Sequence, residues 1–377
     1  MHKKYIFYVL LILNTSLSMA QKQRCRDYGI QIGILPIGKT NTILDVSGVK
    51  VGQLTKIQGD SIRTGVTAIL PHDGNIFKEK VPAAIYVGNG YGKLAGITQV
   101  SELGNIESPI ILTNTLSVAA GIEGVVKYTL SQKGNQNIQS VNAVVGETND
   151  GYLNDIRGMH ISAQDVITTI ESATSDGMTE GNCGAGTGTS CFGWKGGIGT
   201  SSRKLPKSLG GYTVGVLVQT NFGGNLQIAG APVGEWLGKY PYKEAIENAD
   251  GSCMIVVATD APLSDRNLLR VAKRAMLGLA KTGGIASNGS GDYVIAFSSH
   301  PDIRIAHERT DQKLDNLALL NNNDMSPLFM ATIEATEEAI INSLFAAETM
   351  VGRNGHRVEK LPIENIMDRI ISIQNKK

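Results

Sequence analysis

The chain alternates between two kinds of hydrophobic pattern. Short apolar runs bounded by turn residues predict buried strands at residues 65–71, 83–88, 109–113, 141–147, 212–220 and 254–258, and a glycine turn leading into a strand at 287–299. Apolar residues at helical spacing predict helices at residues 116–130, 162–173, 264–279, 327–350 and 363–373. Because strands and helices are interspersed, and several strands are apolar on both faces, the pattern predicts a layered α/β fold with sheet buried between helices.

The first 20 residues have the pattern of a secretory signal peptide. A basic start at residues 2–4 precedes an apolar run at 5–13, and Ser18, Met19 and Ala20 form a small-residue cleavage site. The apolar run is too short to span a bilayer, and no other run reaches that length. We therefore expect residues 21–377 to form a single exported domain, periplasmic or extracellular, with no membrane contact once the signal is removed.

Composition narrows the function further. The 35 basic and 34 acidic residues give a net charge of +1, so the chain lacks the excess positive charge with which proteins bind nucleic acids. The sequence has no HExxH motif and no cysteine or histidine cluster with metal spacing, so we expect no metal and no cofactor. Export permits a disulfide, and Cys183 and Cys191 are close enough in the sequence to form one, but buried free thiols are the favoured interpretation of the four cysteines.

Two glycine-rich segments could bind phosphate. Residues 33–40 match the P-loop pattern G-x-x-x-x-G-K-[ST], which requires a helix directly after the loop. Pro36 interrupts this match, and alternating apolar residues at 44–51 predict short strands there, so we interpret it as a chance match. The glycines of residues 181–203 predict a wide loop, which either lets backbone approach backbone or lines a site with N–H groups.

Ser252 lies just before the apolar run 254–258 and directly after Gly251. The sequence lacks a GxSxG nucleophile elbow; Ser290 is similar only in its flanking glycines, and a strand follows it. If the peptide bond before Ser252 is cut, that residue carries a nucleophile and an α-amine of pKa about 7.7–8.0, which can act as its base. Ser252, Ser290 and Asn221 all lie at strand ends, so neighbouring strands would bring them to one sheet edge.

The chain resembles the DmpA-type self-processing serine aminopeptidases, which include the L-aminopeptidase/D-esterase and the β-peptidyl aminopeptidases. The resemblance covers nearly all of the mature chain and rests on several long motifs in one order, among them GETNDGYLND at 146–155, YTVGVLVQTNFG at 212–223, DGSCMIVVATDAP at 250–262 and SNGSGDYVIAFS at 287–298. It implies a four-layer αββα sandwich that resembles N-terminal-nucleophile hydrolases but differs in topology. It also implies cleavage between Gly251 and Ser252 into a larger subunit, residues 21–251, and a smaller one, residues 252–377. These family members form homo-oligomers, often tetramers.

The resemblance also assigns roles to site residues. Ser252 would be the nucleophile, with Ser290 and Asp292 forming a hydrogen-bonded group beside it, and Asn221 would help to bind the oxyanion. Glu147 would hold the ammonium of the substrate, and Tyr152 is a further candidate on the oxyanion side.

Together, the residues and the resemblance predict an exported N-terminal-serine aminopeptidase. It would hydrolyse the first residue of small peptides, amides or esters through an acyl-enzyme on Ser252. Cys253 and Thr220 depart from the residues expected in the family and could alter the shape of the pocket. Whether the acyl residue is L-α, D-α or β stays open. The alternative is a non-catalytic peptide- or glycan-binding protein of the same fold.

Overall fold

The computed structural model describes residues 23–241, 251–308 and 314–375. The predicted signal peptide, residues 1–20, lies outside the described residues. Within these ranges, no helix is both long and apolar enough to cross a membrane.

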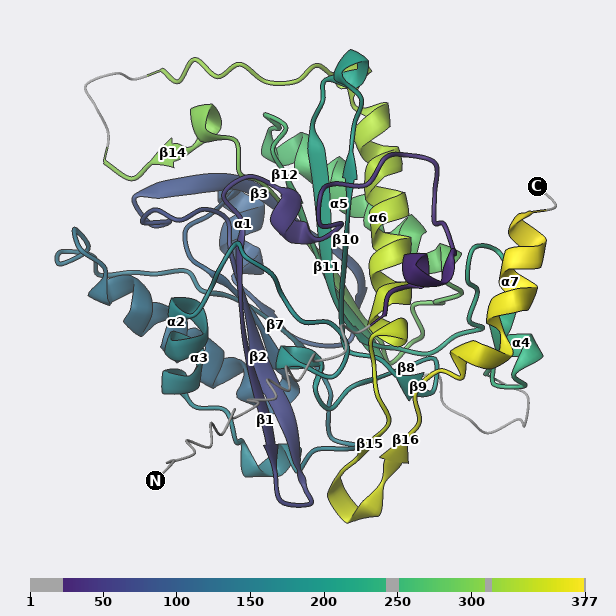
Figure 1. Cartoon of the computed structure of the whole chain (residues 1–377). Helices are drawn as coiled ribbons and strands as arrows, with labels where there is room; N and C mark the ends of the chain where they lie inside the picture. Colours follow the sequence, from purple (N-terminus) through teal and green to yellow (C-terminus); the bar gives the residue numbers. More distant parts are fainter. Residues whose placement is uncertain (1–22, 242–250, 309–313, 376–377) are drawn as a thin grey trace, which may run out of the picture.

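A seven-stranded sheet runs through the centre of the molecule (Figure 1). Its strand order is β10 (Ile198–Lys204), β11 (Thr213–Asn221), β12 (Ser252–Thr259), β13 (Gly291–Ser298), β3 (Glu79–Gly90) and β14 (Ile305–Ala306), with β5 (Asn105–Ile106) paired to β3. The central strand β12 is antiparallel to β11 and parallel to β13. The start of β12 therefore lies beside the end of β11 and the start of β13.

A five-stranded sheet faces it. The order is β1 (Lys50–Gln58), β2 (Ile62–Leu70), β6 (Ile110–Asn114), β7 (Val144–Thr148) and β4 (Leu94–Ala95), and β6 is parallel to β7. The carboxyl ends of β6 and β7 consequently meet at one edge of this sheet.

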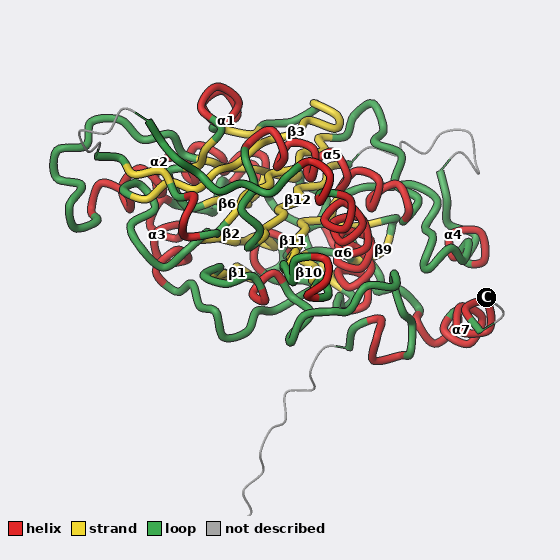
Figure 2. The backbone as a smooth tube through the Cα atoms, turned by 90° about the horizontal axis from the view of Figure 1, so that it is seen from above, coloured by secondary structure: helices red, strands yellow, loops and turns green. Residues whose placement is uncertain are grey.

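Helices cover the outer face of each sheet, so the molecule has four layers (Figure 2). The helices α2 (Val118–Ser131) and α3 (Ala163–Glu171) pack on the five-stranded sheet, and α5 (Asp265–Lys281) and α6 (Ser326–Phe345) pack on the seven-stranded sheet. The alternation along β12 explains the layering, because Met254 and Val256 join the core between the sheets whereas Ile255 and Val257 join the core under α5 and α6. The predicted αββα sandwich is confirmed.

The remaining elements are short. They are α1 (Ile97–Leu103), α4 (Val233–Trp236), α7 (Met367–Gln374), the hairpin of β8 (Ser190–Cys191) and β9 (Trp194–Lys195), and the hairpin of β15 (Met350–Val351) and β16 (Arg357–Val358).

Three local predictions are wrong in part. Residues 43–45 form a 3-10 turn and not a strand, because the side chain of Thr42 caps it by accepting the N–H of Leu44. The glycine-rich segment 181–203 is not loop throughout, since β10 occupies its end. The helix predicted to reach residue 350 ends at Phe345, where the chain turns away and the N–H of Glu348 donates to Asn182 at 2.8 Å. All four cysteines are buried thiols outside any disulfide, so Cys183 and Cys191 are not bonded to each other.

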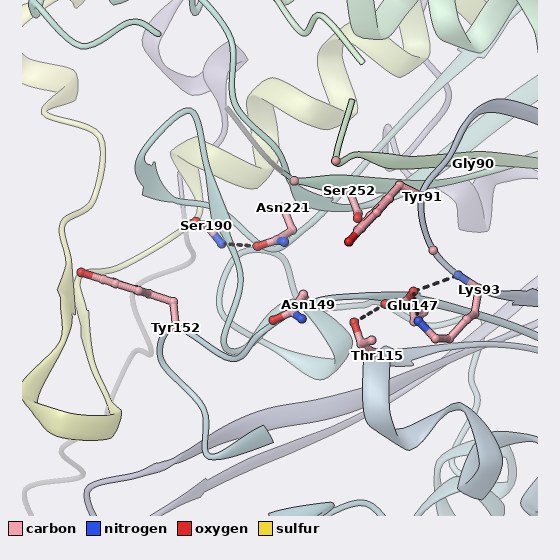
Figure 3. A pocket seen from close by; sticks show the side chains of 13 residues that line it. Gly90, Tyr91, Lys93, Thr115, Glu147, Asn149, Tyr152, Ser190, Asn221 and Ser252 are labelled. Atoms are coloured by element: carbon pink, nitrogen blue, oxygen red, sulfur yellow. Dashed lines mark hydrogen bonds and ion pairs between the residues drawn. The ribbon is translucent and has the colours of Figure 1, made fainter. Parts of the chain in front are cut away.

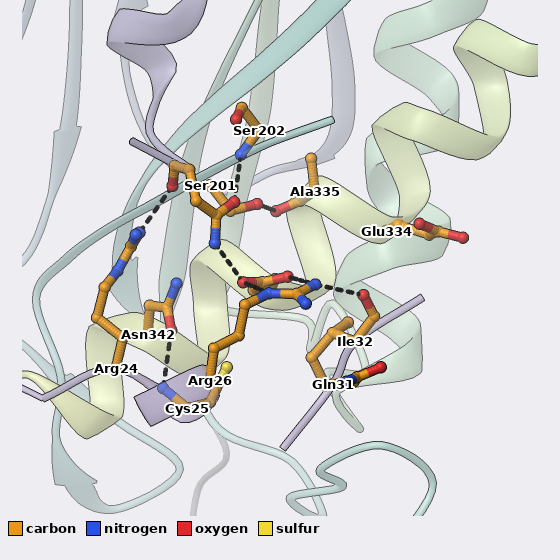
Figure 4. Close-up of polar contacts among 12 residues, drawn as sticks. Arg24, Cys25, Arg26, Gln31, Ile32, Ser201, Ser202, Glu334, Ala335 and Asn342 are labelled. Atoms are coloured by element: carbon orange, nitrogen blue, oxygen red, sulfur yellow. Dashed lines mark hydrogen bonds and ion pairs between the residues drawn. The ribbon is translucent and has the colours of Figure 1, made fainter. Parts of the chain in front are cut away.

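A buried ionic network ties the first described residues to β10 and α6 (Figure 4). Arg203, which is fully buried, contacts Glu334 at 3.0 Å and Glu338 at 2.7 Å, and Arg26 contacts the other oxygen of Glu338 at 2.7 Å. Burial alone would raise the pKa of Glu338, but the hydrogen bond from Arg26 and the charge of Arg203 lower it. Each buried charge is thereby paired, as burial requires.

The same network includes the segment 33–40, which matches the P-loop pattern. The N–H groups of Ile34 and Leu35 donate to the carboxylate of Glu334 at 2.9 and 3.1 Å. A Cβ on Gly33 would lie 2.1 Å from that carboxylate, so only glycine fits there. The backbone of this segment therefore binds a carboxylate of the protein itself, which agrees with the interpretation as a chance match.

Candidate active site

The strand register brings the predicted nucleophile to the edge of the central sheet. Asn221 pairs with Ser252 across β11 and β12, and Ser252 pairs with Gly291 across β12 and β13. Ser290 directly precedes β13 in the sequence. The expectation that Asn221, Ser252 and Ser290 meet at one sheet edge is therefore confirmed as geometry.

A cleft of about 690 Å³ opens at this edge (Figure 3). It is lined by five of the predicted residues, namely Glu147, Tyr152, Asn221, Gly251 and Ser252, and by Gly90, Tyr91, Gly92, Lys93, Thr115, Asn149, Ser190 and Gly289. Ser290 and Asp292 do not line the cleft and are buried behind it. A volume of this size is typical of a small-molecule site.

Ser252 reaches the cleft with 8% of its surface exposed. Its Oγ accepts a hydrogen bond from the N–H of Gly291 at 3.2 Å, and the same N–H lies 3.2 Å from the carbonyl oxygen of Gly251. One backbone donor thus contacts both the predicted nucleophile and the carbonyl of the predicted cleavage site.

Asp292 lies beside Ser252 in the neighbouring strand, opposite Cys253. Burial raises the pKa of this carboxyl to about 6, and the Ser290 hydroxyl and the Cys253 N–H offset part of the effect. These two groups are close enough to affect the carboxyl, but among the described residues neither Ser290 Oγ nor either oxygen of Asp292 has a hydrogen bond of good geometry, so the expected hydrogen-bonded group is not formed in this structure. Unpartnered buried polar atoms are uncommon and concentrate at functional sites.

Asn221 is oriented by the β8–β9 hairpin. Its Oδ1 accepts the N–H of Ser190 at 3.1 Å, which leaves the Nδ2 as the group directed toward Ser252 (Figure 3). An amide nitrogen can only donate, so it suits an oxygen that becomes negative during reaction.

Glu147 comes from the facing sheet, at the end of β7. It is buried, with one oxygen accepting the N–H of Lys93 at 2.9 Å and the other accepting the hydroxyl of Thr115. The ammonium of Lys93 lies 3.9 Å from the first oxygen. A carboxylate held in this way can bind a cation inside the cleft.

Tyr152 lies at the outer end of the cleft and points away from Ser252 (Figure 3). Its ring stacks on His356 with centroids 4.4 Å apart. Beyond it, a second hollow of about 360 Å³ contains Lys239, Arg357 and Glu359 and shares Tyr152 and Ser190 with the cleft. This position suits contact with the departing part of a substrate better than contact with an oxyanion at Ser252.

Several lining residues were not predicted from the sequence. Thr115 and Asn149 closely follow predicted strands, as Glu147 and Asn221 end them, so the same strand-end pattern could have indicated them. Lys93 and Ser190 carry no such signal, because they reach the cleft from a loop and a short hairpin. Within the described ranges, no cluster of three or more His, Cys, Asp or Glu side chains could hold a metal ion.

The fold is similar to that of solved serine aminopeptidases, a variant of the N-terminal-nucleophile hydrolase fold, and the chain is a serine-type aminopeptidase. The model of peptidase family S58 matches residues 41–358, and the chain belongs to that family.

Named relatives and solved structures support this assignment to the family. The chain is 39% identical to the β-peptidyl aminopeptidase BapA of Sphingosinicella microcystinivorans, over 91% of this chain and 90% of BapA. The β-aminopeptidase of a Burkholderia species superposes with a TM-score of 0.84 at 38% identity, covering 94% of this chain and 99% of that one. The L-aminopeptidase D-Ala-esterase/amidase of Ochrobactrum anthropi, a prototype of the serine aminopeptidases, superposes at 0.85 with 32% identity, covering 93% and 99%.

Proposed function

We propose that the chain is an exported, self-processing aminopeptidase that removes the N-terminal residue, β-amino acids included, from small peptides, amides and esters. The observation that carries the proposal is the position of Ser252, whose Oγ opens into the cleft beside the carbonyl of the residue before it. The β-peptidyl aminopeptidase relatives support the β-acyl part.

Self-processing would begin with attack of Ser252 Oγ on the carbonyl carbon of Gly251. The N–H of Gly291, 3.2 Å from that carbonyl oxygen, would stabilise the negative charge that develops on it. The acyl group moves from the nitrogen of Ser252 to its oxygen, and water then hydrolyses the ester. The products are the larger subunit ending at Gly251 and a smaller subunit with a free α-amine on Ser252.

In the mature enzyme this α-amine would act as the base. It would take the proton of Ser252 Oγ during attack on the substrate and return it to the leaving amine. Asn221 Nδ2 would donate to the oxyanion, and Glu147 would hold the substrate ammonium at the opposite wall. Ser290 and Asp292 would position the amine from behind. The part of the substrate that leaves with the amine would lie toward Tyr152.

Export by residues 1–20 and assembly into a homo-oligomer of cleaved protomers, with the tetramer common in the family as the candidate form, complete the proposal. Both rest on the signal-peptide pattern and the family resemblance.

The test is the intact mass of the purified protein under denaturing conditions. Cleavage before Ser252 divides a chain of 377 residues and 40.1 kDa, once the signal peptide is removed, into pieces of roughly 25 and 13 kDa. Ser252→Ala should remain a single inactive chain, whereas Ser299→Ala, at the far end of β13, should be processed as the wild type is. Processing of Ser252→Ala would refute the nucleophile, and an uncut wild-type chain that binds peptides without hydrolysis would favour the binding-protein alternative.

A further inference from the structure

The wall of the cleft formed by Glu147 carries a second charged group, the ammonium of Lys93. Lys93 follows β3 in a short turn, and its own N–H donates to Glu147 at 2.9 Å, which fixes the turn against the carboxylate. Its ammonium lies 3.9 Å from the same oxygen (Figure 3), while 57% of the side chain is exposed. The end of the cleft that receives the substrate N-terminus therefore carries one positive and one negative charge.

This pair is a poor match for an ammonium alone. A substrate with only an N-terminal ammonium would share Glu147 with Lys93 and would be repelled by it. A substrate with an ammonium and a carboxylate on the same carbon places opposite charges against both. The four charges then alternate in sign around the site, which is the arrangement of lowest electrostatic energy.

Space beside the carboxylate is kept open by Gly92. A Cβ at this position would lie 3.0 Å from Glu147 Oε1 and 3.3 Å from the hydroxyl of Tyr293. A side chain there would crowd the approach to Glu147, so glycine leaves room for a branched, charged N-terminal group.

We infer that Lys93 binds a carboxylate on the N-terminal residue, and that peptides beginning with a β-linked aspartyl residue are a substrate class of this site. In such a residue the ammonium and the free carboxylate share one carbon, and the reacting carbonyl lies one methylene further on. It is thus a β-amino acyl group with a carboxylate beside its ammonium. The inference rests on the proposed function, with Ser252 Oγ accepting the β-aspartyl acyl group, the leaving amine taking a proton, and water releasing free aspartate.

The experiment compares two dipeptides that differ only in this carboxylate, β-aspartyl-leucine and β-alanyl-leucine. The readout is the ratio of their kcat/KM values. We expect the wild type to prefer the β-aspartyl peptide and Lys93→Met to lower the ratio at least tenfold, chiefly through the KM of the β-aspartyl peptide. Lys93→Arg, which keeps the charge, should retain most of the preference. Lys127→Met on α2, which removes a lysine paired with Glu123 outside the cleft lining, should leave the ratio unchanged.

The outcomes separate this inference from the proposed function. Hydrolysis of β-alanyl-leucine without hydrolysis of the β-aspartyl peptide, or a ratio unaffected by Lys93→Met, would overturn the role of Lys93 while leaving the aminopeptidase intact. If the wild type cleaves neither dipeptide nor simple aminoacyl amides, the proposed function itself fails.

Discussion

Replacing Glu147 by glutamine should separate binding of the substrate ammonium from every other step at this site. Glutamine keeps the size of the side chain and one oxygen to accept the N–H of Lys93. The change therefore removes the negative charge at the end of β7 with little effect on packing. Self-processing should continue, because the residue attacked there, Gly251, has no free ammonium.

The size of the effect follows from the burial of this carboxylate. Two unit charges about 3 Å apart attract by roughly 5 kcal/mol at an effective dielectric constant of about 20. Desolvation offsets part of this, and a hydrogen bond to a charged group contributes about 1.5–3 kcal/mol. We therefore expect Glu147→Gln to lower kcat/KM roughly 10- to 150-fold for a substrate with an N-terminal ammonium.

The assay is a two-by-two comparison of wild type and Glu147→Gln on β-alanyl-p-nitroanilide and its des-amino analogue, propionyl-p-nitroanilide. The loss should appear with the first substrate and be nearly absent with the second, which has no ammonium. An equal loss with both would show that Glu147 shapes the cleft and does not bind the ammonium. Denaturing gels of each preparation confirm that equal amounts of processed enzyme are compared.

Three further predictions concern processing and stability. Gly251→Ala should slow self-processing at least tenfold, as measured in a gel time course. The reason is that a Cβ at this position would lie 2.3 Å from the backbone oxygen of Asn221, and overpacking of this kind costs about 1–3 kcal/mol. An unchanged rate of processing would contradict this reasoning. Before the α-amine exists, we expect the Asp292 carboxylate, in the strand next to Ser252, to assist loss of the Ser252 hydroxyl proton. Processing should therefore slow as the pH falls through about 6, where Asp292 becomes protonated, and Asp292→Asn should be slow and independent of pH. A flat wild-type profile between about pH 5 and 7 would exclude this role for the carboxylate. Burial raises the pKa of Asp150 from 3.8 to about 6, so this group favours the folded state below about pH 4 and loses about 3 kcal/mol of that contribution as the pH rises through 6. Urea unfolding of Asp150→Asn should lack this pH-dependent component, whereas a pH dependence identical to wild type would refute the assignment.

The parts of the site that depend on local pattern were predictable from the sequence. A glycine–serine pair before an apolar run is local information, and it placed Ser252 at the start of a buried strand, as found. Neighbouring strand ends likewise brought Asn221 and Ser290 to the same edge. Helix starts marked by a capping serine, such as Ser162 and Ser264, were also found at the residues expected.

The parts that depend on long-range packing were not predictable. Lys93 becomes part of the site only because the turn after β3 packs against the end of β7 in the other sheet. The chain just beyond α6 is held by Asn182, 166 residues earlier in the sequence, which accepts the N–H of Glu348, and no local residue signals this contact. Burial of Asp292, which raises its pKa, likewise follows from the sheet register and not from the Ser-Gly-Asp motif.

The division of the site between two sheets constrains how substrates are accommodated. Ser252 belongs to the seven-stranded sheet, while Glu147 belongs to the five-stranded sheet, so their separation is set by the packing between the sheets. That packing is close just below the site, where Met254 occupies the space left by the missing side chain of Gly146, whose Cβ would lie 2.3 Å from the methionine Cε. Because close-packed cores do not adjust smoothly, the proposed nucleophile Ser252 and the carboxylate of Glu147 lie at a fixed spacing. An N-terminal residue with an extra methylene has a longer distance between its ammonium and its carbonyl. Such a residue would then be selected by how well that distance matches the spacing of Glu147 and Ser252, and not by movement of the protein.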